Sequence, residues 1–178
     1  MILAHWKDNK SVGETIKDIK NMAEKYHTHE KIRELAVKLI VNTGRKNYRD
    51  WEKRLSNYLF QNVPYIPDMK SADGIQSPLL TLGLKLKNYI GGDCDCHTAA
   101  LLSLLESIGY NSGNEKAWAY PISVSWEKNH VMKHVFIITP YYLIDTSERK
   151  KVYQYTPETL KQVLKSVYPG ITAFKVWR

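Results

Sequence analysis

Both cysteines of the chain, Cys94 and Cys96, lie in the stretch GGDCDCHTAALLSLLESIGY, where a glycine pair precedes an apolar helical segment. Two thiols at this spacing could form a disulfide, bind a metal ion or include a nucleophile. A disulfide between them would close a very small loop and remove little entropy from the unfolded chain. Two cysteines in 178 residues are also no disulfide scaffold. The sequence therefore favours a metal site or a nucleophile.

A metal site could combine Cys94, Cys96 and His97 with either His130 or His134. Structural zinc sites usually place roughly two to four residues between their paired cysteines, and Cys-x-Cys-His lacks that spacing. The metal site is the weaker of these two interpretations.

Cys94 is the better candidate nucleophile because it sits where the glycine turn becomes a helix. Unpaired amide groups and the positive end of the helix dipole stabilise a thiolate there, and the same amides can bind an oxyanion. Gly91 and Gly92 let the backbone turn sharply. Cys96 lies about 200° further round a helix, at about 100° per residue, so we expect it to point into the core as a small apolar side chain.

A thiol nucleophile needs a base, and the base needs an orienting group on its other ring nitrogen. His134 opens a strand-like segment, and Asp145 ends the next one. If the two segments pair across the turn at Tyr141, these side chains lie side by side at one rim of a sheet. Each residue alone also fits an ordinary role: an inert buried thiol, a strand histidine and a turn aspartate. Their order is what predicts a Cys94, His134, Asp145 triad.

The elements that would position these residues can be read from the spacing of apolar residues. Residues 11–62 predict three helices, and the prolines and glycine of 62–77 predict a connecting loop. The helix after Cys94 is apolar nearly all round and should be buried until Gly109. Strands are expected at 117–126, from His134 and from Tyr141, then a helix from about Thr156 and a last strand at 171–177. The predicted fold class is α+β, with an antiparallel sheet of about four strands.

Composition indicates one domain over 1–178, with a helical layer (1–62), a catalytic core (63–147) and a C-terminal helix and strand (148–178). The net charge of +8 is interleaved with acids, so nucleic acid is not expected as the main partner. No segment looks like a secretory signal or a membrane span. We expect a cytoplasmic protein with no membrane partner, or a virion-associated one if the chain is phage-encoded.

The sequence resembles the transglutaminase-like branch of the papain-like cysteine enzymes, closest to its bacterial and phage cysteine proteases. The resemblance covers about half of the chain and is carried by Gly92-Asp93-Cys94-Asp95, the Ala/Leu-rich helix ending at Ile108-Gly109-Tyr110, His134-Val135-Phe136, Leu143-Ile144-Asp145-Thr146, and an upstream loop with Val63-Pro64-Tyr65-Ile66-Pro67-Asp68 and Ser77-Pro78-Leu79-Leu80-Thr81-Leu82. The family most often has an acid where this chain has Cys96.

The resemblance implies that Cys94 is the nucleophile, His134 the general base and Asp145 its orienting residue. The expected reaction is acyl transfer through a thioester on a protein or peptide substrate, with hydrolysis preferred because it needs no amine pocket. A cross-linking transglutaminase and a catalytically silent binding or assembly module of the same fold are the alternatives. No organic cofactor is implied, and no acidic loop is arranged for calcium.

Overall fold

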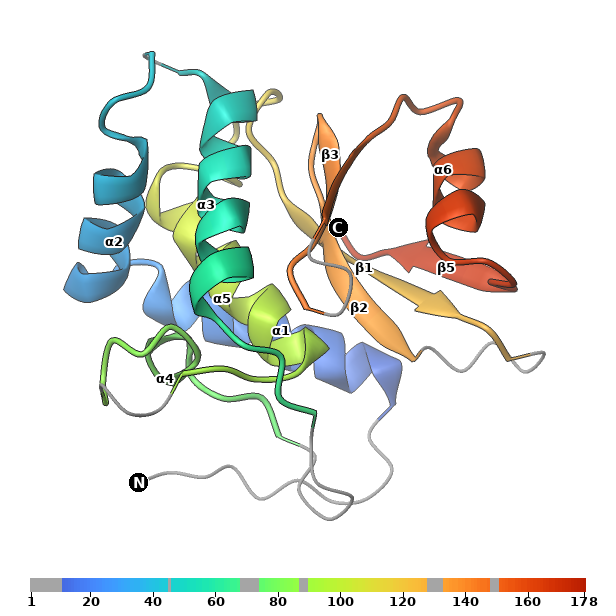
Figure 1. Cartoon of the computed structure of the whole chain (residues 1–178), viewed down its shortest axis with the longest axis horizontal. Helices are drawn as coiled ribbons and strands as arrows, with labels where there is room; N and C mark the ends of the chain where they lie inside the picture. Colours follow the sequence, from blue (N-terminus) through green and yellow to red (C-terminus); the bar gives the residue numbers. More distant parts are fainter. Residues whose placement is uncertain (1–10, 45, 68–73, 87–89, 128–132, 148–150) are drawn as a thin grey trace.

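The computed structural model describes residues 11–44, 46–67, 74–86, 90–127, 133–147 and 151–178. It confirms an α+β chain in which helices and a five-stranded antiparallel sheet lie side by side (Figure 1). The three predicted N-terminal helices are α1 (Val12–Tyr26), α2 (Glu30–Ile40) and α3 (Tyr48–Asn62). Within the described residues, no helix combines the length and the apolar character needed to cross a bilayer.

The central helix is α5 (Cys94–Ser107), which begins at the predicted nucleophile. Every residue from Asp95 to Leu105 is buried, as the all-round apolar pattern predicts. The helix packs against α1, α2, α3 and the short α4 (Pro78–Thr81), and on its other side against the sheet. Its first turn is capped by the Asp93 carboxylate, which accepts a hydrogen bond from the amide of Cys96 at 3.2 Å.

The sheet has the order β4-β3-β2-β1-β5, and all its neighbours are antiparallel. Its strands are β1 (Tyr120–Ser125), β2 (His134–Ile138), β3 (Tyr142–Asp145), β4 (Lys151–Gln154) and β5 (Ala173–Val176). Four of them match the predicted strands. The prediction missed β4, a four-residue edge strand whose ends are exposed and whose sequence KVYQ gives little alternation of apolar and polar residues.

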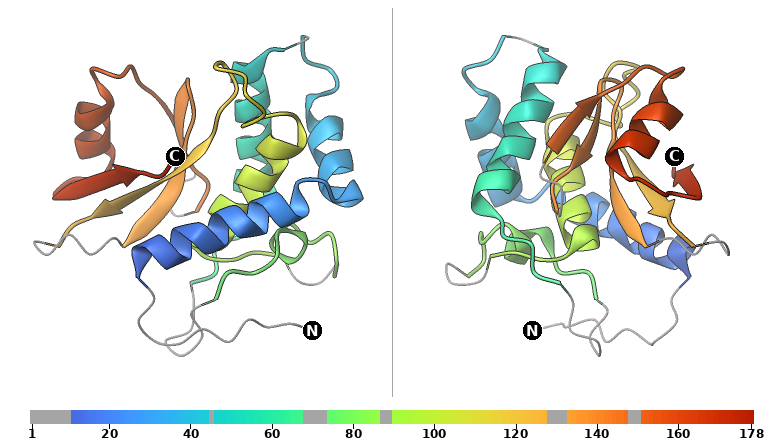
Figure 2. Two further views of the ribbon diagram at one scale, coloured as in Figure 1. Left: turned by 180° about the vertical axis from the view of Figure 1, so that it is seen from behind. Right: turned by 45° about the vertical axis from the view of Figure 1, so that its right-hand side comes forward.

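Helices cover both faces of the sheet (Figure 2). Val135, Ile137 and Ile144 belong to the core shared with α1, α2, α3 and α5. The opposite face packs against α6 (Leu160–Val167) through a second cluster of buried residues: Ile122, Val124, Phe136, Ile138, Leu143, Leu164 and Tyr168. The prediction that this helix begins near Thr156 is wrong, since it begins at Leu160. Before it, Thr156 and Thr159 form a turn in which each backbone amide donates to the hydroxyl of the other residue, and the Thr159 hydroxyl donates to the Thr156 carbonyl.

A buried carboxyl group joins the helical layer to the sheet. Glu52 of α3 has 0% exposure, and its two oxygens accept hydrogen bonds from the hydroxyls of Tyr110 at 2.8 Å and Thr139 at 2.7 Å. Burial raises the pKa of Glu52 to about 7, although these bonds and the charge of Arg49 act in the opposite direction. One buried carboxyl group therefore links α3 to the turn after α5 and to the β2–β3 turn.

Candidate active site

The segment before Cys94 is fixed by pairing with the upstream loop. The Gly92 amide donates to the Pro64 carbonyl at 3.3 Å, and the Ile66 amide donates to the Gly92 carbonyl at 2.9 Å. A β-carbon on Gly92 would lie 2.5 Å from that of Cys96. Gly91 has φ +122°, and a β-carbon there would lie 2.7 Å from the Pro64 carbonyl oxygen. Both glycines are therefore needed for the loop to meet the start of α5.

The two cysteines differ as predicted. Cys96 is fully buried, and its sulfur accepts a hydrogen bond from the amide of Gln76 at 3.2 Å. Cys94 is partly exposed at the start of α5. Only Cys94 is therefore placed to meet a substrate.

Cys94 lies against the beginning of β2. The backbone of Val135, the residue after His134, acts to lower the pKa of the Cys94 thiol. One turn further along α5, the Thr98 hydroxyl lies 2.7 Å from the carbonyl oxygen of Cys94 and 3.2 Å from that of Val135. These contacts bring the first turn of the helix to the strand that carries the candidate base.

His134 and Asp145 meet as the predicted strand pairing requires. The strands β2 and β3 pair Ile137 with Ile144 and Ile138 with Leu143, which brings the start of β2 to the end of β3. His134 Nε2 lies 2.8 Å from Asp145 Oδ2, and both side chains are buried. This hydrogen bond leaves Nδ1 of the imidazole as the nitrogen that can exchange a proton with a thiol.

Asp145 accepts four hydrogen bonds from residues that the structure describes. Oδ1 receives the amide of Ser147 at 3.0 Å and its hydroxyl at 2.8 Å, while Oδ2 receives the Tyr168 hydroxyl at 2.6 Å in addition to His134. Burial by itself raises the pKa of Asp145, but the hydrogen bond and charge of His134 and the bonds from Tyr168 and Ser147 outweigh it and hold that pKa below its usual value. Asp145 is thus ionised at neutral pH, so His134 Nε2 carries a proton and donates it.

The prediction that the helix start lowers the pKa of the Cys94 thiol is wrong in direction. Desolvation by the surrounding protein raises that pKa well above its usual value, and the carboxylates of Asp93 and Asp95 raise it further. The backbone bond with Val135 lowers it but is outweighed. Cys94 is therefore a neutral thiol at rest, and its proton must leave during the reaction.

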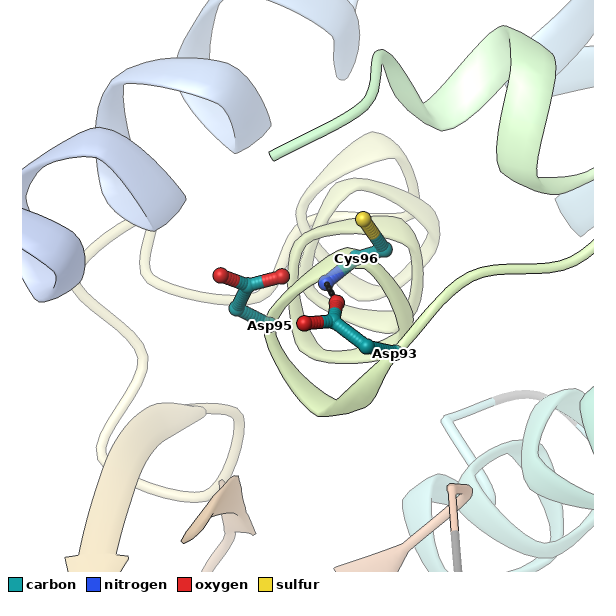
Figure 3. A group of neighbouring side chains, drawn as sticks. All are labelled: Asp93, Asp95 and Cys96. Carbon is teal, nitrogen blue, oxygen red and sulfur yellow. Dashed lines mark hydrogen bonds between the residues drawn. The ribbon is translucent and has the colours of Figure 1, made fainter. Parts of the chain in front are cut away.

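The described residues that could together bind a metal ion differ from the predicted set. Asp93, Asp95 and Cys96 each offer one ligand atom within 4.8 Å of the others, and Figure 3 shows the three side chains gathered at the start of α5, with the Asp93 carboxylate turned toward the Cys96 amide. Cys94 is not part of this group, and the Asp93 carboxylate already caps the helix. His130 lies outside the described residues.

His97 has a structural role that the sequence does not reveal. The ring is 1% exposed, and its Nε2 lies 3.3 Å from the carbonyl oxygen of Pro64. Burial lowers the pKa of His97, while the carbonyls of Pro64 and Thr146 act in the opposite direction. His97 thus links α5 to the upstream loop as a neutral side chain.

Three further residues at this site were missed by sequence reasoning: Thr98, Ser147 and Tyr168. Ser147 follows Asp145 by two residues, a spacing at which an aspartate commonly accepts from the backbone, so this contact had a local signal. Tyr168 had none, because Asp145 is distant in the sequence; for Thr98 the bond to the Cys94 carbonyl is an ordinary local helix contact, and the bond to Val135 is the one that the sequence does not reveal.

No protein-family model matches the chain, and no curated protein or solved structure matches it significantly. The resemblance to the transglutaminase-like enzymes therefore stays a prediction, and the case for function depends on the geometry of the site itself.

Proposed function

We propose that this chain is a thiol-dependent acyl-transfer enzyme with a papain- or transglutaminase-like core, in which Cys94, His134 and Asp145 form the catalytic triad. The observation that carries the proposal is the bond between His134 Nε2 and Asp145 Oδ2 at the start of β2, the strand whose Val135 carbonyl accepts from Thr98 of the helix that begins at Cys94. A thiol on a partly exposed residue, a base and a buried orienting carboxylate are the parts that covalent acyl transfer needs. A nucleophile at a helix start packed on an antiparallel sheet supports the same core.

The reaction begins with a neutral thiol. As the Cys94 sulfur attacks the carbonyl carbon, its proton passes to His134 Nδ1, and the ionised Asp145 stabilises the imidazolium. The backbone amide of Cys94, at the first position of α5, has no carbonyl acceptor within the helix, so it can donate to the oxyanion. The intermediate then collapses, the C–N bond breaks, and His134 returns the proton to the leaving amine. A thioester on Cys94 remains.

The thioester is resolved by water or by an amine. When water attacks, His134 takes its proton, the C–S bond breaks, and a carboxylic acid and the free thiol are released. Hydrolysis is the preferred outcome because water needs no binding pocket, which makes the chain a cysteine protease or amidase. An amine in place of water would give the cross-linking product of a transglutaminase.

The proposal is tested by trapping the thioester. The native protein is incubated with the p-nitrophenyl ester of an N-blocked amino acid, quenched in acid and mapped by mass spectrometry for an acyl group that hydroxylamine removes. We expect this group on Cys94 in the native protein and in Cys96→Ala, and not in Cys94→Ala. Acylation confined to lysines, or to Cys96, would overturn the proposal.

The same assay separates the alternatives. A primary amine added in excess diverts the acyl group into an amide if the site accepts amines, and leaves the acid as product if it does not. The raised pKa of Cys94 is the observation that favours a catalytically silent module instead. A silent module predicts a folded protein in which Cys94 acquires no acyl group at any pH that preserves the fold.

A further inference from the structure

A tyrosine from the C-terminal part of the chain reaches the His134–Asp145 pair. Tyr168 follows α6 immediately, is 2% exposed, and donates its hydroxyl to Asp145 Oδ2 at 2.6 Å. That oxygen is the one bonded by His134 Nε2. The two donors therefore share the charge of a single carboxylate oxygen.

The ring of Tyr168 is held in place on several sides. Its centroid lies 5.1 Å from that of Phe136, 5.7 Å from that of His134 and 5.9 Å from that of Trp126. The Tyr168 amide donates to the Leu164 carbonyl at 2.8 Å, which closes the end of α6. The indole of Trp126 donates to the carbonyl of Pro169 at 3.1 Å and fixes the following turn. The hydroxyl is thus aimed at Asp145 by packing and backbone bonds together.

Resting on the function proposed above, we propose that Tyr168 is a positioning residue that sets the basicity of His134 through Asp145. Its hydroxyl competes with the imidazole for the negative charge on Oδ2. A weaker attraction between Asp145 and the imidazolium keeps His134 able to release the proton that it takes from the thiol. Tyr168 also fixes the direction of the carboxylate, and so the orientation of the ring.

Other titratable groups face this pair and must be considered in any pH measurement. Cys94 and His97 of α5 interact electrostatically with Asp145, and Lys151 of β4 is the backbone partner of Asp145 across the sheet edge. Among the hydrogen bonds of the described residues, none of these groups shares Oδ2 with His134. A change made only at the Tyr168 hydroxyl therefore isolates its contribution.

The test is an NMR titration of the His134 ring in the native protein and in Tyr168→Phe, with the signal assigned by its loss in His134→Ala. Removing the hydroxyl leaves more charge on Oδ2 for the imidazolium, so we expect the titration midpoint to rise by about one pH unit. The acid limb of Cys94 acylation should move upward with it. Tyr155→Phe is the matched control, because it deletes a hydroxyl that donates to the Thr139 carbonyl at 2.6 Å. We expect no change in the midpoint there.

Replacement of Tyr168 by a fluorinated tyrosine keeps the shape of the ring and makes its hydroxyl a stronger donor, so the midpoint should fall. This variant also covers the case in which Tyr168→Phe does not fold. An unchanged midpoint in both Tyr168 variants, or an equal change in Tyr155→Phe, would overturn the proposal even if Cys94 forms a thioester. If the midpoint shifts as expected but no thioester forms, the positioning role stands and the proposed function fails.

Discussion

The side chains of Cys94 and Cys96 show how two residues of one type, separated by a single position, take opposite roles. Cys96 is buried against the loop that carries Gln76, where its sulfur acts as a hydrogen-bond acceptor, whereas Cys94 is partly exposed beside β2. The helical period alone predicted this difference. The protonation state of Cys94 could not be predicted that way, because burial and the flanking carboxylates outweigh the helix dipole.

The first prediction concerns Cys96 alone. Cys96→Ala removes the acceptor of the Gln76 amide and part of the core, and we expect it to lower the free energy of unfolding by about 1–3 kcal/mol while Cys94 still acquires the acyl group. Urea unfolding measures the first effect and the ester assay the second. If Cys96→Ala folds but Cys94 acquires no acyl group, the assignment of the nucleophile to Cys94 is wrong.

At the scale of elements, the fold was predictable where periodicity is strong. The three N-terminal helices, the buried α5 and four strands follow from apolar spacing, and the pairing of β2 with β3 follows from the short turn at Pro140 and Tyr141. The edge strand β4 was missed because KVYQ gives little alternation of apolar and polar residues, and the start of α6 because Thr156 and Thr159 bond each other in a turn before Leu160. Tyr168 was missed for a different reason: its role exists only once α6 lies on the β2–β3 face.

The glycine turn before α5 gives a prediction at this scale. In Gly92→Ala the new β-carbon meets that of Cys96 at 2.5 Å, so the first turn of α5 must move. We expect a loss of about 1–3 kcal/mol in stability and a fall in Cys94 acylation of about a hundredfold for each 1 Å of displacement. Gly44→Ala, where nothing lies within 4 Å of the added carbon, is the control. Equal acylation in the two variants would contradict the role given to the turn.

At the scale of the whole molecule, Glu52 couples the helical layer to the sheet. Its pKa of about 7 in the folded protein exceeds the ordinary 4.5, so the unfolded chain releases the proton at lower pH than the folded protein does. Stability should therefore fall as pH rises from 4.5 to 7, by about 3 kcal/mol for a shift of this size.

Denaturant unfolding at several pH values tests this coupling. We expect Glu52→Gln to flatten the decline over this pH range, and Glu34→Gln, on the exposed surface of α2, to leave it unchanged. A decline that persists in Glu52→Gln would show that another group is responsible.

The most direct test of the proposed triad is alkylation of the native protein by iodoacetamide at neutral pH, mapped separately to Cys94 and Cys96. Because Cys94 is a neutral thiol at rest, the triad predicts that it reacts only as His134 takes its proton, that the buried Cys96 does not react, and that His134→Ala slows Cys94 by about a hundredfold or more. The urea-unfolded forms of both proteins should react equally at the two cysteines, which controls for the reagent. If Cys94 reacts at the same rate with and without His134, or neither cysteine reacts until the chain unfolds, the triad does not operate.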